Sequence, residues 1–465
     1  MPAAAQWGSP KDWPAAKKWL HIAIVASMTM ATPLASSIHT PALPLIAADF
    51  SIDRSAASLS VPLYVLGFAT GPLLFLPLSK AYGRLYIYNA ANFMLLLGNL
   101  GCALSPAFAW LLVFRFLAGC GGACAITQGS GTIADIIEKE NRGKAVAFMA
   151  FGTVWAPILG PVIGGQIAEK FGWRGCFWAL MCVVAFNTLI TLLFMQETST
   201  THHFNTPHWT RLFRPHLLFP STHNYTKLEE GGDLQPRRFR DIMFQAVCSP
   251  FRLLLHPIVC VVAVLSSIFY SIQIFLYVDI PATYKAEYGF TPSQTGLAFL
   301  GNGIGMTVGL VTFGLFSDRI MIYLAGHGPR MPEYRLPLMM LSVTLVFCGL
   351  VGYSLTAFSS IDWIYPIIAN GFTGAGLYSL SMAASTYLID LAPERAAESA
   401  TLLATVRFPF GAAVCALSEK IVPLIGRTTT KEVFATVALL TLPAVFILYK
   451  YGERIRANHV SKFSV

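Results

Sequence analysis

The sequence predicts an all-α membrane protein with twelve transmembrane helices arranged as two six-helix halves. Its composition is the first observation, because 55% of the 465 residues are hydrophobic, only 12% are charged and the mean hydropathy is +0.59. Charged residues make up about a quarter of a soluble domain. The second observation is that the charged residues cluster. Between the clusters lie uncharged runs whose length is close to the roughly 20 residues that a helix needs to cross a bilayer core. The third is one long polar segment that divides these runs six and six.

Twelve uncharged or nearly uncharged runs follow one another along the chain. Residues 1–19 precede the first run, contain Trp7, Trp13 and three lysines, and lack the short apolar core of a cleavable signal peptide, so we expect a cytoplasmic tail. The predicted spans are 20–40, 61–78, 87–105, 110–134, 145–168, 175–196, 257–280, 294–316, 336–357, 362–389, 398–418 and 433–449.

The distribution of basic residues supports this number of spans. If the N-terminus is cytoplasmic, the cytoplasmic segments contain 23 of the 32 Lys and Arg residues and the outer loops contain 7. The other two, Arg115 and Arg407, lie inside spans. Positive charge favours the cytoplasmic side, so the asymmetry predicts that both termini are cytoplasmic.

The long polar segment, residues 197–256, separates the two halves. Within it, Pro236–Asp241 could form a basic surface helix against anionic lipid, but a solvated linker between the halves is the favoured interpretation. The predicted organisation is a tail at 1–19, a first half at 20–196, a central loop at 197–256, a second half at 257–450 and a tail at 451–465.

Weak internal similarity supports two related halves. The matching residues fall at equivalent places in each half, before its third span and in or just after its fourth. They are Gly71, Ser79 and Lys80 with Gly309, Ser317 and Asp318, and Gly119, Gly121 and Asp135 with Gly374, Gly376 and Asp390.

Three motifs in the first half lead to a family resemblance. They are "GPLLFLPLSKAYGR" at Gly71–Arg84, "RFLAGCGGACAITQGSGTIADI" at Arg115–Ile136, and "ILGPVIGG" at Ile158–Gly165. "PEYRLP", "FTPSQTGLAFLGNGIG" and "YLIDLAPERAAES" agree in the second half. With these motifs the chain resembles the major facilitator superfamily, in particular the twelve-span drug:proton antiporter branch and its fungal members, which export drugs or secondary metabolites.

The first motif implies a clamp between the cytoplasmic ends of helices. Gly71, Gly83 and Arg84 match the family pattern, whereas Lys80 stands where the family usually has an acid. Arg84 could still pair with Asp135 across the loop. The same residues also fit a simpler role, in which basic side chains hold a short loop on the cytoplasmic side.

The second motif places Arg115 inside a span, where a charge is costly and should face the bundle interior. The resemblance implies a role in proton transfer. The alternative is that Arg115 reaches an interface or donates hydrogen bonds to backbone carbonyls.

The third motif implies a close-packed and bendable fifth span. Gly152, Gly160, Gly164 and Gly165 clear a helix face for another backbone. Pro161 removes one helical hydrogen bond and allows a bend. In the resembling family this signature accompanies export.

Polar and aromatic residues inside other spans are candidates to line a central cavity, although each also fits ordinary helix–helix contacts. Two arginines inside spans and no acid deep in any span favour anionic or neutral substrates over cations. His39, near the outer end of the first span, is one candidate to carry the proton, although an ordinary helix-end histidine is the favoured interpretation. By family analogy, the cavity candidates are Ser36, Gln128, Tyr270, Gln273, Asn302, Asn370, Tyr378 and Arg407.

The expected function is therefore export of an organic small molecule, with proton-coupled uptake of a nutrient as the alternative. A membrane enzyme or receptor is less favoured, because clustered metal ligands and a phosphate-binding Gly-x-x-x-x-Gly-Lys motif are absent from the sequence. We expect no cofactor, metal or nucleic acid, with protons, the small molecule and the lipid bilayer as partners. A monomer in the plasma membrane is expected.

Overall fold

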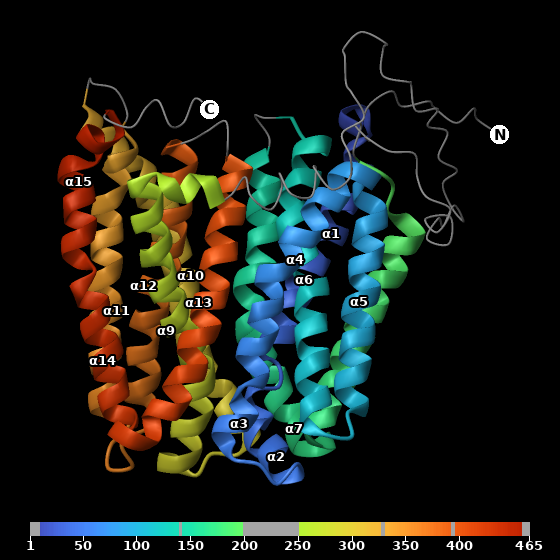
Figure 1. Ribbon diagram of the computed structural model, residues 1–465, viewed down its shortest axis with the longest axis vertical. Helices are drawn as coiled ribbons and strands as arrows, with labels where there is room; N and C mark the ends of the chain where they lie inside the picture. The colour runs from blue at the N-terminus through green and yellow to red at the C-terminus, as the bar shows by residue number, and fades with distance from the viewer. Residues whose placement is uncertain (1–9, 139–141, 199–250, 327–330, 392–395, 458–465) are drawn as a thin grey trace.

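The computed structural model is a bundle of long helices (Figure 1). It describes residues 10–138, 142–198, 251–326, 331–391 and 396–457. Pro236–Asp241 and most of the predicted central loop lie outside the described residues.

The first half comprises the helices before the central segment. Pro33, Pro72, Pro77, Pro157 and Pro161 all lie inside helices, where neighbouring helices can compensate for the hydrogen bonds that proline removes. The elements are η1 (Pro10–Asp12), α1 (Ala15–Ser37), η2 (Thr40–Ala42), α2 (Leu43–Asp49), α3 (Arg54–Ser58), α4 (Ser60–Tyr82), α5 (Arg84–Leu104), α6 (Phe108–Ile136) and α7 (Arg142–Phe194).

The second half follows the central segment. Its elements are η5 (Leu253–Leu255), α9 (Pro257–Tyr288), α10 (Pro292–Ala325), η6 (Pro332–Arg335), α11 (Leu336–Thr356), α12 (Ile364–Leu391), α13 (Ala396–Ile425), α14 (Arg427–Leu440) and α15 (Leu442–Ala457).

Ten of the described helices or merged helical segments are long and apolar enough to cross a membrane. The 53-residue α7 is interrupted at Gly172, whose φ of 72° is non-helical, so two of the predicted spans meet there. α12, with 28 residues, is a further long helix of the bundle. Gly83 and Gly426 supply positive φ angles of 100° and 86° at two other helix junctions.

Several helices are longer than the sequence predicted. α10 continues to Ala325 and α13 to Ile425, because the predicted spans ended at the first polar residues and the helices do not. The last predicted span is two helices, α14 and α15, which meet at Thr441.

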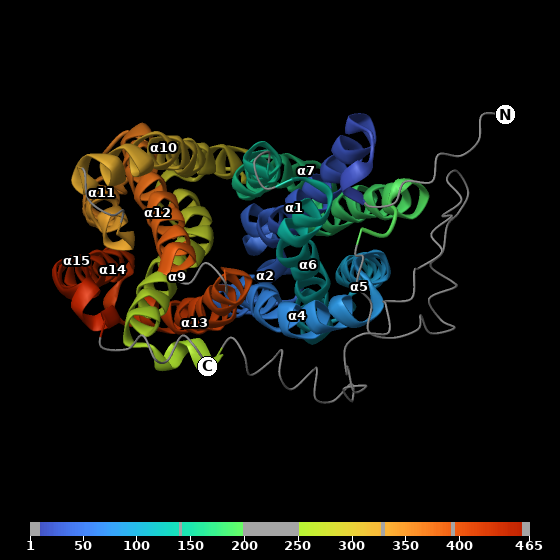
Figure 2. The ribbon, with the colours of Figure 1, turned by 90° about the horizontal axis from the view of Figure 1, so that it is seen from above.

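The two halves stand side by side when the bundle is seen along its helices (Figure 2). The start of α1 and the end of α15 lie at one end of the bundle (Figure 1). We call this the Arg84 end and the opposite one, where α7 is interrupted, the Gly172 end.

Small residues allow close helix packing in the second half. A Cβ atom built at Gly301, Gly305 or Gly309 of α10 would overlap the backbone of α12. With no hydrophobic driving force between helices in lipid, such close backbone approach supplies much of the packing energy.

Candidate functional site

The α7 motif packs against helices of both halves. A Cβ at Gly164 would overlap the carbonyl oxygen of Ile38, and one at Gly160 would overlap the Ser37 hydroxyl, so both glycines face the end of α1. Gly152 lies on the same side but nearer the Arg84 end, where a Cβ would come 3.2 Å from the Cβ of Met30.

The same motif also faces α10. A Cβ at Gly165 would overlap the carbonyl oxygen of Pro292, and one at Gly296 would overlap the carbonyl oxygen of Pro161. α7 and α10 therefore approach backbone to backbone, and the motif lies where the two halves meet.

Arg84 forms the ion pair with Asp135 that the sequence left open. Its Nε lies 2.5 Å from Oδ2 and its Nη2 lies 3.3 Å from Oδ1, so the contact is bidentate. Gly131 leaves room for the guanidinium, since a Cβ there would overlap it. Glu197 accepts hydrogen bonds from the backbone N–H groups of Arg84 and Leu85, at 3.0 and 3.1 Å, and so places a carboxylate at the start of α5.

Gly71 allows α4 to pack closely against α6, because a Cβ there would overlap the carbonyl oxygen of Cys120. Gly83 provides the turn that delivers Arg84 to the start of α5. The side chain of Lys80 lies outside what the structure describes.

A similar cluster lies in the second half. The Nε of Arg335 is 2.5 Å from Oδ2 of Asp390, and its Nη1 donates to Ser317 at 2.7 Å and to Asp318 at 3.2 Å. Ser317, Asp318 and Asp390 are three of the positions that the internal similarity had matched. Each half thus has an Arg–Asp pair at the Arg84 end.

Arg115 is fully buried and its guanidinium is satisfied by backbone carbonyls. Nη1 donates to Ala35 at 2.8 Å, Nη2 to Ser36 at 3.3 Å and Nε to Ser60 at 3.1 Å. The guanidinium also lies 4.2 Å from the centre of the Tyr64 ring. This is the backbone-bonding arrangement that the sequence left as an alternative, and it joins α6 to α1 and α4.

His39 lies close to this arginine. It is fully buried and its Nε2 is 3.0 Å from the Ser60 hydroxyl. Ser60 therefore contacts Arg115 through its carbonyl and His39 through its side chain.

Arg407 of α13 is a half-buried arginine in a different environment. Its Nη1 lies 3.3 Å from the Ser381 hydroxyl, and its Nε has no hydrogen-bond partner among the described residues. The guanidinium carbon is 5.4 Å from the centre of the Tyr270 ring and 4.9 Å from that of Phe408. Tyr378 lies close enough to interact with the guanidinium electrostatically.

Buried amide side chains continue this polar region. Tyr270 and Gln273 are three residues apart on α9, which places them on one helix face. The Gln273 Nε2 donates to the Asn302 Oδ1 of α10 at 3.4 Å. The remaining amide atoms, Gln273 Oε1, Asn302 Nδ2 and both polar atoms of Asn370, are buried without hydrogen-bond partners among the described residues.

Asn370 lies next to this pair along α12. It is one helical turn from Gly374, and a Cβ at Gly374 would overlap the backbone carbonyl oxygen of Asn302. The structure therefore gathers five of the six second-half cavity candidates around α9, α10, α12 and α13, with Asn370 on the adjoining turn.

The two first-half candidates make local contacts. The Ser36 hydroxyl donates to Pro33 of its own helix at 2.7 Å. Gln128 is fully buried and its Nε2 contacts the Phe75 carbonyl of α4 at 3.4 Å and the Cys124 sulfur at 3.0 Å.

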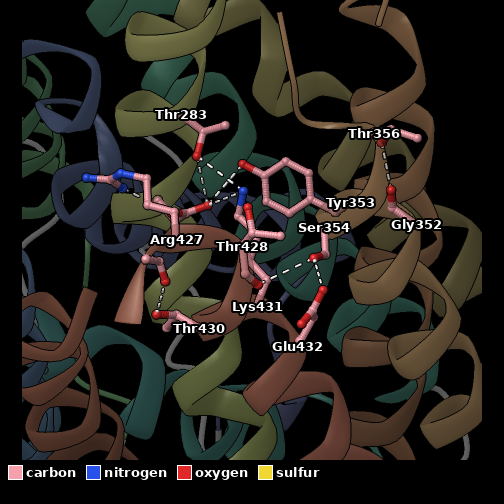
Figure 3. A network of polar contacts seen from close by, with 12 residues as sticks. Thr283, Gly352, Tyr353, Ser354, Thr356, Arg427, Thr428, Thr430, Lys431 and Glu432 are labelled. Carbon is pink, nitrogen blue, oxygen red and sulfur yellow. Dashed lines mark hydrogen bonds and ion pairs between the residues drawn. The ribbon is translucent and has the colours of Figure 1, made fainter. Parts of the chain in front are cut away.

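A buried ion network in the second half was missed by the sequence reasoning (Figure 3). Asp279 of α9 is fully buried and lies 3.1 Å from Arg427 Nη1 and 3.4 Å from Lys431 Nζ. It also accepts hydrogen bonds from Tyr353 at 3.0 Å and Thr283 at 3.2 Å. These contacts join α9, α11 and α14.

A sequence signal for this network existed. Arg427 and Lys431 fall between the predicted spans 398–418 and 433–449, in an outer loop where basic residues are unexpected, and Asp279 lies at the end of the predicted span 257–280. Two basic residues on the outer side of the membrane and an acidic residue at a similar depth can neutralise each other's charge.

Comparison with known proteins decides the family. A sequence profile of the Major Facilitator Superfamily matches residues 25–454. The chain belongs to the major facilitator superfamily.

Members of this superfamily in fungi match nearly the whole chain. It is 34% identical to the MFS-type transporter MFS19 of Alternaria alternata, over 98% of this chain and 92% of that protein. It is 32% identical to the efflux pump radE of Floropilus chiversii, over 97% of this chain and 83% of that protein. The chain is accordingly a multi-pass membrane transporter of the superfamily.

Solved superfamily structures share the fold. The xylose transporter XylE from E. coli, in a partially occluded inward open conformation, matches with a TM-score of 0.68, covering 94% of this chain and 98% of XylE at 12% identity. A D-xylose-proton symporter matches with a TM-score of 0.65, covering 91% of this chain and 96% of the symporter at 15% identity. At these identities the likeness concerns the fold.

Proposed function

We propose that this superfamily member exports an organic small molecule, anionic or neutral, in exchange for protons. The superfamily fold and the fungal relatives support transport, and the relative named an efflux pump supports export. We propose further that the protein is a monomer in the plasma membrane, with twelve spans and both termini in the cytoplasm.

The observation that carries the substrate class is the environment of Arg407. Its guanidinium forms no ion pair within the described part of the chain, and its Nε is unpartnered although buried. A partly buried charge without a counter-ion is unfavourable, so a ligand that supplies a carboxylate, enolate or carbonyl oxygen would lower that cost. Tyr270 and Phe408 offer aromatic surfaces beside it.

The proposed twelve spans are compatible with the helices and their junctions. The ten long apolar segments count α7 once and α14 with α15 once. Counting α7 as two spans that meet at Gly172, and adding α12, gives twelve. This arrangement returns the chain to the Arg84 end, where the predicted cytoplasmic loops carry most of the positive charge.

The α7 motif supports alternating access by rocking of two halves. At the Gly172 end, Gly165 and Gly296 bring α7 and α10 into backbone contact, so the halves are closed there. We assign the structure to the state that faces the Arg84 end, where substrate would enter from the cytoplasm.

Binding to purified protein tests the substrate class. Organic carboxylates and organic cations of matched size would be titrated against the protein in detergent, with the Arg407→Ala variant as a control. Binding of carboxylates that is lost in this variant supports the proposal. Binding of cations without binding of carboxylates contradicts it.

A further inference from the structure

Glu169, near the Gly172 end of α7, makes polar contacts from the first half to the second. Its Oε2 accepts a hydrogen bond from the Thr291 hydroxyl at 3.4 Å and another from the backbone N–H of Ser293 at 3.3 Å. Thr291 is the N-cap of α10 and Ser293 lies in its first turn. The contact therefore joins the carboxylate of one half to a helix start of the other.

The hydrogen bonds at the start of α10 show what this carboxylate supplies. Pro292 has no N–H to satisfy, the N–H of Gln294 donates to the Thr291 hydroxyl, and that of Thr295 donates to the Thr291 carbonyl. The N–H of Ser293 is the remaining donor of this turn, and Glu169 accepts from it. The cap of α10 is thus completed by the opposite half.

Close backbone packing holds Glu169 at this position. Gly165 lies one turn before it and faces the Pro292 carbonyl, and Gly296 faces the Pro161 carbonyl. Negative charge at a helix N-terminus is favourable, so the carboxylate adds attraction where the two backbones already touch.

We propose that Glu169 is a latch that holds the halves together at the Gly172 end, and that it must release α10 each time the transporter opens there. It acts as a positioning residue for the conformational change. The inference rests on the proposed alternating access.

The strength of the contact suits a latch that opens repeatedly. Glu169, Thr291 and Lys170 are all exposed, and both hydrogen bonds of the latch are longer than 3.2 Å. Water can replace each of them when the halves separate, so opening leaves no buried polar group unsatisfied. The buried Asp279 network, by contrast, joins helices of one half and would travel with them as a unit.

Hydrogen–deuterium exchange of the full-length protein in lipid nanodiscs tests the latch. The variants are Glu169→Ala and Glu169→Gln, with Lys170→Ala as the matched control on the same exposed turn. We expect Glu169→Ala to raise amide exchange in the first turn of α10 and in the facing part of α7 by about two- to tenfold. Exchange at the Arg84 end should fall, because the population shifts toward closure there, and Glu169→Gln should show a smaller effect in the same direction.

Exchange that matches the wild type at both ends would overturn the latch. A rise confined to the amide of Ser293 and its immediate neighbours would also overturn it, because that result describes a local cap. The Lys170→Ala variant should exchange like the wild type. The measurement needs no substrate, so a failed latch in a protein that still exports leaves the proposed function standing.

Discussion

At the scale of single residues, the two arginines inside the spans have different surroundings. Arg115 donates to three backbone carbonyls, whereas Arg407 has one side-chain donor contact and a buried Nε without a partner. The sequence showed only that both charges lie within apolar runs. It could not separate them, because the carbonyls that satisfy Arg115 come from α1 and α4, 55 to 80 residues away along the chain.

Replacing Arg407 by Ala should weaken binding of an organic carboxylate by at least about tenfold, because a hydrogen bond to a charged group contributes about 1.5–3 kcal/mol. The variant should keep a normal thermal unfolding temperature, since few protein contacts are lost. Arg407→Lys should be intermediate, because lysine keeps the charge but not the planar fork. Titration of wild type and variants in detergent measures this, and equal affinity in all three would exclude Arg407 from the site.

Asp279 should matter for stability. Changing it to Asn leaves Lys431 buried beside an uncharged partner, which we expect to lower the free energy of unfolding by about 3–5 kcal/mol. Removing Lys431 as well, in the pair Asp279→Asn with Lys431→Met, should recover part of the loss. Thermal unfolding in detergent reports the change, with the exposed Asp53→Asn as control, and an unfolding temperature equal to that of the control would contradict this account of the network.

At the scale of elements, the motif "ILGPVIGG" predicted a close-packed fifth span, and the structure shows what it packs against. The residue pattern indicated that one face was cleared for another backbone. It could not indicate that Gly160 and Gly164 face α1 while Gly165 faces α10, because those helices lie far from α7 in the sequence. Nor could hydropathy locate the end of α10, where polar residues continue the helix to Ala325.

Replacing Gly164 by Leu should abolish transport while the protein still reaches the membrane, because a side chain there overlaps the Ile38 backbone and forces α1 away. Gly160→Leu should act in the same way. Gly314→Ala is the control, since a Cβ at that helical glycine meets nothing within 4 Å. Transport per molecule in membrane vesicles, normalised to protein reaching the membrane, decides the matter. Normal transport by Gly164→Leu would reduce the motif to packing without a role in movement.

At the scale of the whole molecule, the Arg–Asp pairs at the Arg84 end repeat from one half to the other. The sequence allowed a pair of Arg84 with Asp135 and matched Asp135 to Asp390, but it gave no indication that Arg335 is the partner of Asp390. The reason is physical: Arg335 lies in the longer loop before α11, where the spacing of the first half no longer applies. The order of the helices could thus be predicted from hydropathy, and the motifs from the residue pattern. The contacts between helices could not be predicted from either.

Reversing one charge of the first pair, as in Asp135→Arg, should lower transport strongly, because two guanidinium groups would then repel each other at the Arg84 end. The double variant Arg84→Asp with Asp135→Arg should restore part of the activity. Transport by the double variant no better than by either single variant would show that the pairing itself is not what the transporter needs.

The central claim, export of an organic anion or neutral molecule in exchange for protons, is tested most directly in inside-out vesicles with an imposed proton gradient. A panel of organic carboxylates, neutral compounds and cations of matched size would be added in turn, with Arg407→Ala vesicles as control. The account predicts that a carboxylate or neutral compound accumulates inside wild-type vesicles and dissipates the proton gradient. In the Arg407→Ala vesicles the same compound should neither accumulate nor dissipate the gradient. Accumulation that is unaffected by a protonophore, or accumulation of cations alone, would contradict it.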